Sequence, residues 1–189
     1  MTDHPTPTPM NDDEAAAFAE EVFDRARKGD ADMLGRLLEK GLPVNLRNGN
    51  GDTLLMLASY HGHLEAVRVL LEHGADPQIA NDKGQLPIAG AAFKGNQAMI
   101  ELLVEKGALI DGASADGRTA LMLAARNGHI GVVRRLLALP QIDLNALNDT
   151  GLSADAFALQ NKNTDIAELI VAERKRRGLR APAMKVTID

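Results

Sequence analysis

The stretch GDTLLMLASYHGHLEAVRVLLEHGAD (residues 51–76) decides the fold of this 189-residue chain. Thr53 is a good helix N-cap, and the apolar run that follows it predicts a short first helix ending at Tyr60. Gly62 allows a sharp reversal of the chain before a second helix begins. That second helix has an apolar stripe at helical spacing, made by Leu64, Val67, Leu70 and Leu71. The stretch therefore predicts a helical hairpin.

The same unit recurs along the chain, because several glycine positions within it repeat with a step of 33 residues. A step shared by series at different phases indicates tandem copies of one structural unit, and such copies stack into a solenoid. The glycine series are Gly29, Gly62, Gly95, Gly128; Gly41, Gly74, Gly107; and Gly51, Gly84, Gly117. The resulting blocks are residues 15–47, 48–80, 81–113, 114–147 and 148–173. A stack of this kind offers a long surface and few deep pockets.

Residues 51–76 and the stretch GRTALMLAARNGHIGVVRRLLALPQID (residues 117–143) resemble ankyrin repeats. The family pattern is roughly G-x-T-P-L-H-x-A-A-x-x-G-H-x-x-V-V-x-L-L-x-x-G-A-D. The resemblance covers three full repeats and two edge blocks, residues 14–173. It implies an all-α ankyrin-repeat solenoid of about five helix-turn-helix units, including two capping units, with hairpin-like turns projecting near a right angle.

Some departures from the family pattern carry structural expectations. Leu86 replaces the capping Thr in the middle repeat, and Gly90 interrupts its first helix. Each change costs about 1 kcal/mol, so we expect the middle repeat to be locally the least stable of the three full repeats. In the last block Asp155 replaces a buried Leu and Lys162 replaces the reversal glycine. These polar residues predict a solvated outer face, as a terminal repeat requires.

Composition limits the class of protein. The chain has no Cys, which excludes disulfides, zinc–thiolate sites and cysteine nucleophiles. Its first residues show no basic start followed by an apolar run, and no stretch approaches the ~20 apolar residues of a membrane span. We expect a monomeric cytoplasmic protein in which residues 1–13 form a disordered lead-in, residues 14–173 the ankyrin-repeat domain and residues 174–189 a basic tail.

The charge is unevenly distributed. The net charge is −5, yet residues 174–185 contain only basic charged side chains, so the rest of the chain is more acidic than this value indicates. An acidic body repels phosphates, which argues against nucleic acid as the partner of the repeats. The basic residues could complete a terminal helix favourably for its dipole and then extend into solvent, or they could contact an anionic partner. They are Arg174, Lys175, Arg176, Arg177, Arg180 and Lys185.

Residues that could carry catalysis or hold a metal do not converge. His63 and His129 occupy the same position two repeats apart, roughly two helix-packing distances of 8–10 Å, too far to share an ion. His61 and His73 lack a carboxylate or third ligand at a recognisable interval. A phosphate-binding loop and a nucleophile elbow are both missing from the sequence. We therefore predict a protein that is not an enzyme and has no metal or cofactor.

The candidate binding residues come from the repeat register. The last positions of successive first helices are Arg27, Tyr60, Phe93 and Arg126, followed by Lys28, His61, Lys94 and Asn127. Tyr60 is the single Tyr of the chain, and rare aromatic residues flanked by Arg have the composition of an interface hot spot. The opposing interpretation is that the rings only cover the seam between repeats. Turn residues would form the outer edge of the site: Asn50, Asp52, Asp82, Lys83, Gln85, Asp116, Arg118, Asp149 and Thr150.

Family members bind proteins on the concave face through turn tips and first helices, and the resemblance implies the same here. The main hypothesis is a non-catalytic scaffold that binds a protein partner, as an adaptor, inhibitor, immunity factor or accessory subunit. The alternative is an anion-directed module whose basic tail binds nucleic acid or an acidic membrane surface.

Overall fold

The computed structural model describes residues 11–182, and within this range the chain is all-α. The expected fold class is confirmed, since the helices form consecutive pairs that stack in one row. The helices are α1 (Asp12–Lys28), α2 (Ala31–Glu39), α3 (Leu54–Tyr60), α4 (Leu64–Glu72), α5 (Pro87–Lys94), α6 (Gln97–Glu105), α7 (Ala120–Arg126), α8 (Ile130–Leu137), α9 (Ala154–Gln160) and α10 (Thr164–Arg176).

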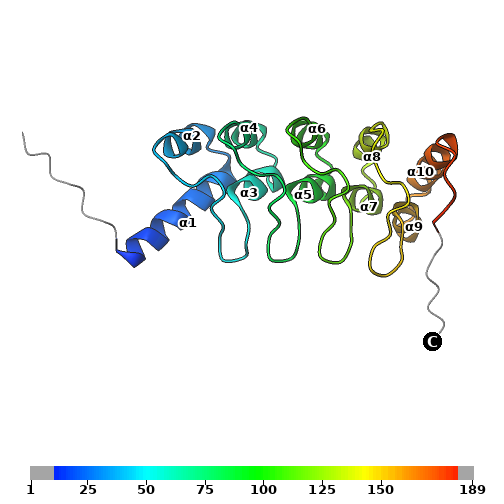
Figure 1. The fold of residues 1–189 in the computed structure, drawn as a ribbon, viewed down its shortest axis with the longest axis horizontal. Helices are drawn as coiled ribbons and strands as arrows, with labels where there is room; N and C mark the ends of the chain where they lie inside the picture. The colour runs from blue at the N-terminus through cyan, green and yellow to red at the C-terminus, as the bar shows by residue number, and fades with distance from the viewer. Residues whose placement is uncertain (1–10, 183–189) are drawn as a thin grey trace, which may run out of the picture.

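Two layers of helices run along the stack (Figure 1). The first helices of the units (α1, α3, α5, α7, α9) contact one another in sequence, and so do the inner second helices α2, α4, α6 and α8. The loops that join one unit to the next extend away from the row of second helices, past the first helices (Figure 1). The turn tips and the first helices therefore share one face of the solenoid.

Neighbouring units are joined through the position that His63 and His129 occupy. His63 donates from Nε2 to the Arg27 carbonyl (2.7 Å), and His129 does the same to the Phe93 carbonyl (2.8 Å). A Cβ at Gly29 would lie 2.4 Å from Cγ of His63, so a larger residue would displace the imidazole. The structural role expected for these histidines agrees with this geometry.

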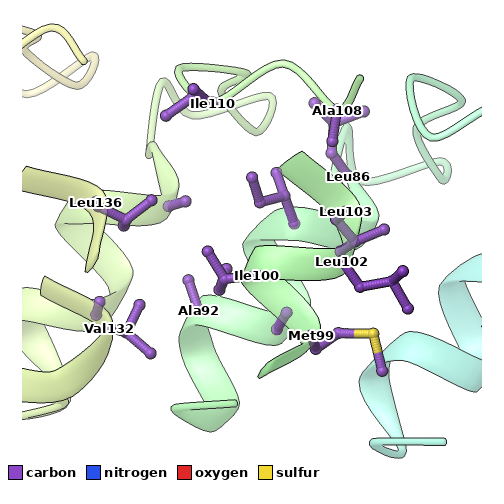
Figure 2. Close-up of a cluster of buried hydrophobic side chains, with 14 of the residues drawn as sticks. Leu86, Ala92, Met99, Ile100, Leu102, Leu103, Ala108, Ile110, Val132 and Leu136 are labelled. Atoms are coloured by element: carbon purple, nitrogen blue, oxygen red, sulfur yellow. The ribbon is translucent and has the colours of Figure 1, made fainter. Parts of the chain in front are cut away.

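The core is continuous from repeat to repeat. Figure 2 shows its central part, where Met99, Ile100 and Leu103 of α6 and Val132 and Leu136 of α8 are fully buried members of one cluster. Aliphatic side chains fill this layer, and burying each one stabilises the fold by about 1.5–3 kcal/mol. The buried residues of all five units form one cluster, so each unit completes its core with residues of its neighbours.

Two of the three full repeats begin their first helix at the capping Thr, and the middle repeat does not. The Thr53 and Thr119 hydroxyls accept hydrogen bonds from the N–H groups of Met56 (3.1 Å) and Met122 (3.4 Å). Leu86 cannot cap α5, but its side chain is buried (8% exposed). The lost cap is therefore exchanged for apolar burial, a compensation that the sequence analysis did not include.

The ends of the described range differ from the expected boundaries. Helix α1 begins at Asp12, ahead of the expected start of the repeats at residue 14, while residues 1–10 and 183–189 lie outside the described range. Helix α10 continues past residue 173 to Arg176. The expected solvated outer face does not hold at Asp155, because its carboxylate pairs with buried Arg174 (2.8 Å). Lys162 does replace the reversal glycine, with a left-handed φ of 64°.

Candidate functional site

A hollow of about 530 Å³ lies where the turn tips meet the first helices of the central repeats, and we call it the groove. Helices α3, α5 and α7 contribute its floor and one wall, and the preceding loops contribute the other wall. The lining residues are Asn50, Asp52, Met56, Leu57, Tyr60, His61, Asn81, Lys83, Gln85, Leu86, Ala89, Gly90, Phe93, Ser114, Arg118, Leu123 and Arg126.

The loop wall is held by asparagine side chains that accept hydrogen bonds from backbone N–H groups. Oδ1 of Asn81 accepts from the N–H groups of Lys83 (3.1 Å) and Gln85 (3.0 Å), which fixes the turn of the middle repeat. Adjacent turns are joined by the backbone, since the Asp82 N–H donates to the Asn50 carbonyl (3.1 Å). Asn81 Nδ2 also donates to Asp52 (2.9 Å). The turn tips are therefore held in register and present their side chains at a constant spacing.

The helix wall carries the two aromatic rings. Tyr60 is 40% exposed and Phe93 44% exposed, and both line the groove. The Tyr60 ring leans over Gly90, where an added Cβ would lie 3.4 Å from Cδ2 of the ring. Lys94 places its Nζ 4.4 Å from the centroid of the same ring, a cation–π distance that helps to hold the Tyr60 side chain. Tyr60 thus combines a supported position with a solvent-exposed surface, and the exposed Phe93 ring lines the same groove.

The structure brings most of the sequence-predicted binding residues to the groove. From the helix ends and the turn tips, the residues that line it are Tyr60, His61, Phe93, Arg126, Asn50, Asp52, Lys83, Gln85 and Arg118. They belong to three consecutive repeats, which agrees with a surface assembled by stacking.

The remaining predicted residues lie outside this lining, and most are engaged within the protein. Arg27 pairs with Glu20 (2.8 Å) and Lys28 with Asp24 (2.5 Å) along α1. At the tips Asp82 pairs with Arg47 (3.1 Å). Lys94 contacts Tyr60, and Asn127 Nδ2 donates to the Leu123 carbonyl (2.7 Å). Asp116 forms an ion pair with Arg118. The others are Asp149 and Thr150 of the last turn.

Sequence reasoning missed the floor of the groove. Leu57, Gly90 and Leu123 occupy one position of successive first helices, a single turn ahead of the row that contains Tyr60 and Phe93. Residues three positions apart share a helix face, so the 33-residue register could have identified them. In the middle repeat Gly90 was interpreted only as a cost to helix stability. The structure shows that its missing side chain lets the Tyr60 ring approach the helix between two leucine positions.

The charges of the groove are mostly positive. Lys83, Arg118 and Arg126 line it, together with the single carboxylate of Asp52. Hydrogen bonds from Arg118 and Ser114 lower the pKa of Asp116 to about 2, so this neighbouring carboxylate stays ionised and offsets the charge of Arg118. Desolvation lowers the pKa of His61, and the neighbouring positive groups add to this effect, so its imidazole is neutral at pH 7. The groove is basic although the whole chain carries −5.

Among the described residues, no group of three or more His, Cys, Asp or Glu side chains is placed to hold a metal ion. The Ser114 hydroxyl donates to Asp116 (2.5 Å) and thereby belongs to the turn. In the same part of the chain, no helix combines the length and apolar character needed to cross a membrane. What the groove presents is exposed aromatic surface, an apolar floor and cationic side chains.

Comparison with known proteins agrees with this architecture. A family model described as Ankyrin repeats (3 copies) matches residues 23–113 and 108–178. The chain is 55% identical over 69 residues to a Pseudomonas aeruginosa protein described as an ankyrin repeat protein, covering 36% of this chain and 39% of that protein. It is 52% identical over 44 residues to an Oryza sativa subsp. japonica protein named as a probable E3 ubiquitin-protein ligase, covering 23% and 8%. The matches thus span less than half of either relative. Since the family model matches most of its length, this chain belongs to the ankyrin-repeat family.

Proposed function

We propose that this ankyrin-repeat protein is a non-catalytic scaffold that binds a protein partner in the groove. In this role it would serve as an adaptor, inhibitor, immunity factor or accessory subunit. Ankyrin repeats are typically protein–protein interaction modules, and the family match supports the same use here. The scaffold supplies a rigid row of turn tips and helix ends, while the partner supplies the biological outcome.

The observation that carries the proposal is the exposure of Tyr60 and Phe93 in the same groove. The chain has only five aromatic Tyr and Phe residues, and these two are 40% and 44% exposed on adjacent repeats. Aromatic anchors in a partly enclosed site are the residues whose removal costs most at interfaces, typically about 2 kcal/mol or more. Exposed apolar surface that is gathered in one hollow and rimmed by polar residues is typical of protein interaction sites.

The structure weakens the alternative of an anion-directed tail. Arg174 is buried against Asp155, Arg176 pairs with Glu173 (2.6 Å), and Arg177 donates to the Leu137 carbonyl (2.7 Å). Half of the basic cluster is therefore engaged in holding the last helix. A direct test replaces Lys175, Arg180 and Lys185 by Ala, because deleting residues 174–189 would also remove Arg174 and Arg177 from the fold. Salt-sensitive binding to DNA or anionic vesicles that this triple variant abolishes would favour the tail over the groove.

The proposed function is tested by comparative affinity capture. Tagged wild-type protein and the Tyr60→Ala/Phe93→Ala variant are used as baits in extracts of the native host, with quantitative mass spectrometry of the bound proteins. We expect a partner that wild type retains and the double variant loses. Circular dichroism and urea unfolding of both baits verify that the solenoid remains intact.

A matched control uses an exposed apolar side chain outside the groove. Leu109 is 60% exposed in the loop after α6 and does not line the groove. Leu109→Ala should capture the same partner as wild type. If the double variant captures it equally well, the aromatic row is not the anchor, and the proposed site is wrong.

A further inference from the structure

The floor of the groove has a gap in side-chain volume at its centre. Where the flanking repeats place Leu57 and Leu123, the middle repeat places Gly90, preceded by Ala89. Gly90 lies inside α5, so a left-handed backbone does not explain its presence. An added Cβ would meet only Tyr60 within 4 Å, with the shortest contact at 3.4 Å. The Tyr60 ring therefore takes up one side of this space, and the rest of it opens into the groove, which Gly90 lines between Leu57 and Leu123 of the flanking repeats.

Two cations on opposite walls of the groove are available to a ligand. Lys83 is on the loop wall and Arg126 on the helix wall, and both side chains are exposed. Within residues 11–182 neither makes an ion pair. The lining carboxylate, Asp52, accepts hydrogen bonds from Asn81 (2.9 Å) and Asn48 (3.3 Å) and so remains committed to the turn. The unsatisfied charge that faces a partner is positive.

We propose that the groove recognises an acidic segment of the partner in which a bulky apolar side chain stands next to Asp or Glu. The apolar side chain enters the space above Gly90 beside the Tyr60 ring, and the carboxylates meet Lys83 and Arg126. This inference rests on the proposed function and specifies the chemistry of the partner. Charge complementarity is its basis, because unpaired cations in a half-enclosed site favour an anionic segment and disfavour a basic one.

The test begins with an unbiased selection of ligands. A library of random 12-residue peptides on phage is panned against the full-length protein, and the enriched sequences are compared with the starting library. We expect enrichment of Asp or Glu next to Leu, Phe or Met. The strongest binders are then synthesised with a fluorescent label, and their Kd values are measured by anisotropy at 50 and 500 mM NaCl. Binding should weaken at the higher salt, as screening reduces charge attraction.

Two pairs of variants separate the apolar and the charged contributions. Gly90→Leu fills the space and should weaken binding at least tenfold, whereas Gly90→Ala adds one methyl group and should change Kd less than threefold. Lys83→Glu/Arg126→Glu should also weaken binding at least tenfold. Its control is Lys40→Glu/Lys106→Glu, which changes the net charge equally at exposed positions outside the groove and should leave Kd within threefold.

The outcomes distinguish this inference from the function on which it rests. Binders that need Tyr60 and Phe93 but are neutral or basic, or that tolerate Lys83→Glu/Arg126→Glu, would overturn the inference and leave the scaffold role intact. Binders that tolerate Tyr60→Ala/Phe93→Ala would argue against the groove itself. A selection that enriches no acidic–apolar sequence also overturns the inference. So does self-association that the charge reversal abolishes, because the occupant would then be a second copy of the chain.

Discussion

Replacing Arg174 should destabilise the last repeat strongly, although the residue belongs to what the sequence presents as a basic tail. Its side chain is 4% exposed and that of Asp155 is 19% exposed. The guanidinium donates to Asp155 at 2.8 and 3.3 Å and to the Leu144 carbonyl at 2.9 Å. Burial alone would raise the pKa of Asp155, but the hydrogen bonds from Arg174 and Ser153 outweigh it and lower that pKa. The carboxylate is therefore ionised in the folded protein.

The expected loss in free energy of unfolding depends on which buried groups each variant leaves without a partner. Removing one partner of a buried ion pair costs about 3–5 kcal/mol. Arg174→Met leaves Asp155 with the Ser153 hydroxyl (2.7 Å), and its partial exposure lets water assist, so we expect about 3 kcal/mol. The double variant Asp155→Leu/Arg174→Met removes both charges and leaves two neutral groups without a partner, the Leu144 carbonyl and the buried Ser153 hydroxyl. An unpaired neutral group costs about 1–3 kcal/mol, less than an unpaired buried charge, so the double variant should be less destabilised than either single variant.

The assay is urea unfolding followed by circular dichroism at 222 nm for wild type, Arg174→Met, Asp155→Leu and the double variant. The four free energies give the coupling between the two residues, which we expect to exceed about 1.5 kcal/mol. A lower m-value in a single variant would show that the last repeat separates from the stack, since m follows the surface exposed. If Arg174→Met loses less than about 1 kcal/mol, or if the double variant loses the sum of the two singles, the pairing argument is wrong.

Three further outcomes are expected. Leu86→Thr restores a helix cap worth about 1 kcal/mol but removes a buried side chain worth about 2 or more, so urea unfolding should show a net loss near 1 kcal/mol. Gly29→Ala should lower the free energy of unfolding clearly more than Gly74→Ala does. Both glycines have a positive φ, so either substitution adds a backbone strain of about 1–2 kcal/mol. Only the Cβ at residue 29 would also collide with a neighbour, the His63 ring. Equal losses would contradict this reasoning. Finally, hydrogen bonds from Arg176 and Arg177 lower the pKa of Glu173 from 4.5 to about 2. As pH decreases, the Glu173 carboxylate is therefore protonated in the unfolded state before it is protonated in the folded state. The free energy of unfolding should fall as pH decreases from 4.5 to 2, and it should fall less steeply in Glu173→Gln.

Sequence determined the solenoid because its information is local. The 33-residue register, the Thr caps and the apolar stripe of each second helix depend on residues within one hairpin and its copies. Such short-range patterns specify the helices and force them to stack, since one hairpin cannot bury its apolar face alone. The same register predicts that Tyr60 and Phe93 lie on one surface, because they are 33 residues apart.

Tertiary structure decided which of the candidate residues face the groove and which are neutralised by neighbours. Asp82 and Asp116 form ion pairs with Arg47 and Arg118, whereas Lys83 and Arg126 line the groove. The partnership of Asp155 with Arg174 joins residues 19 positions apart, a separation that no repeat period indicates. Within its own helix, Gly90 only lowers helix stability. It becomes part of the groove floor because α3 and α7 flank α5 in the stack. Side-chain direction depends on contacts between units, and these contacts exist only after the stack has formed.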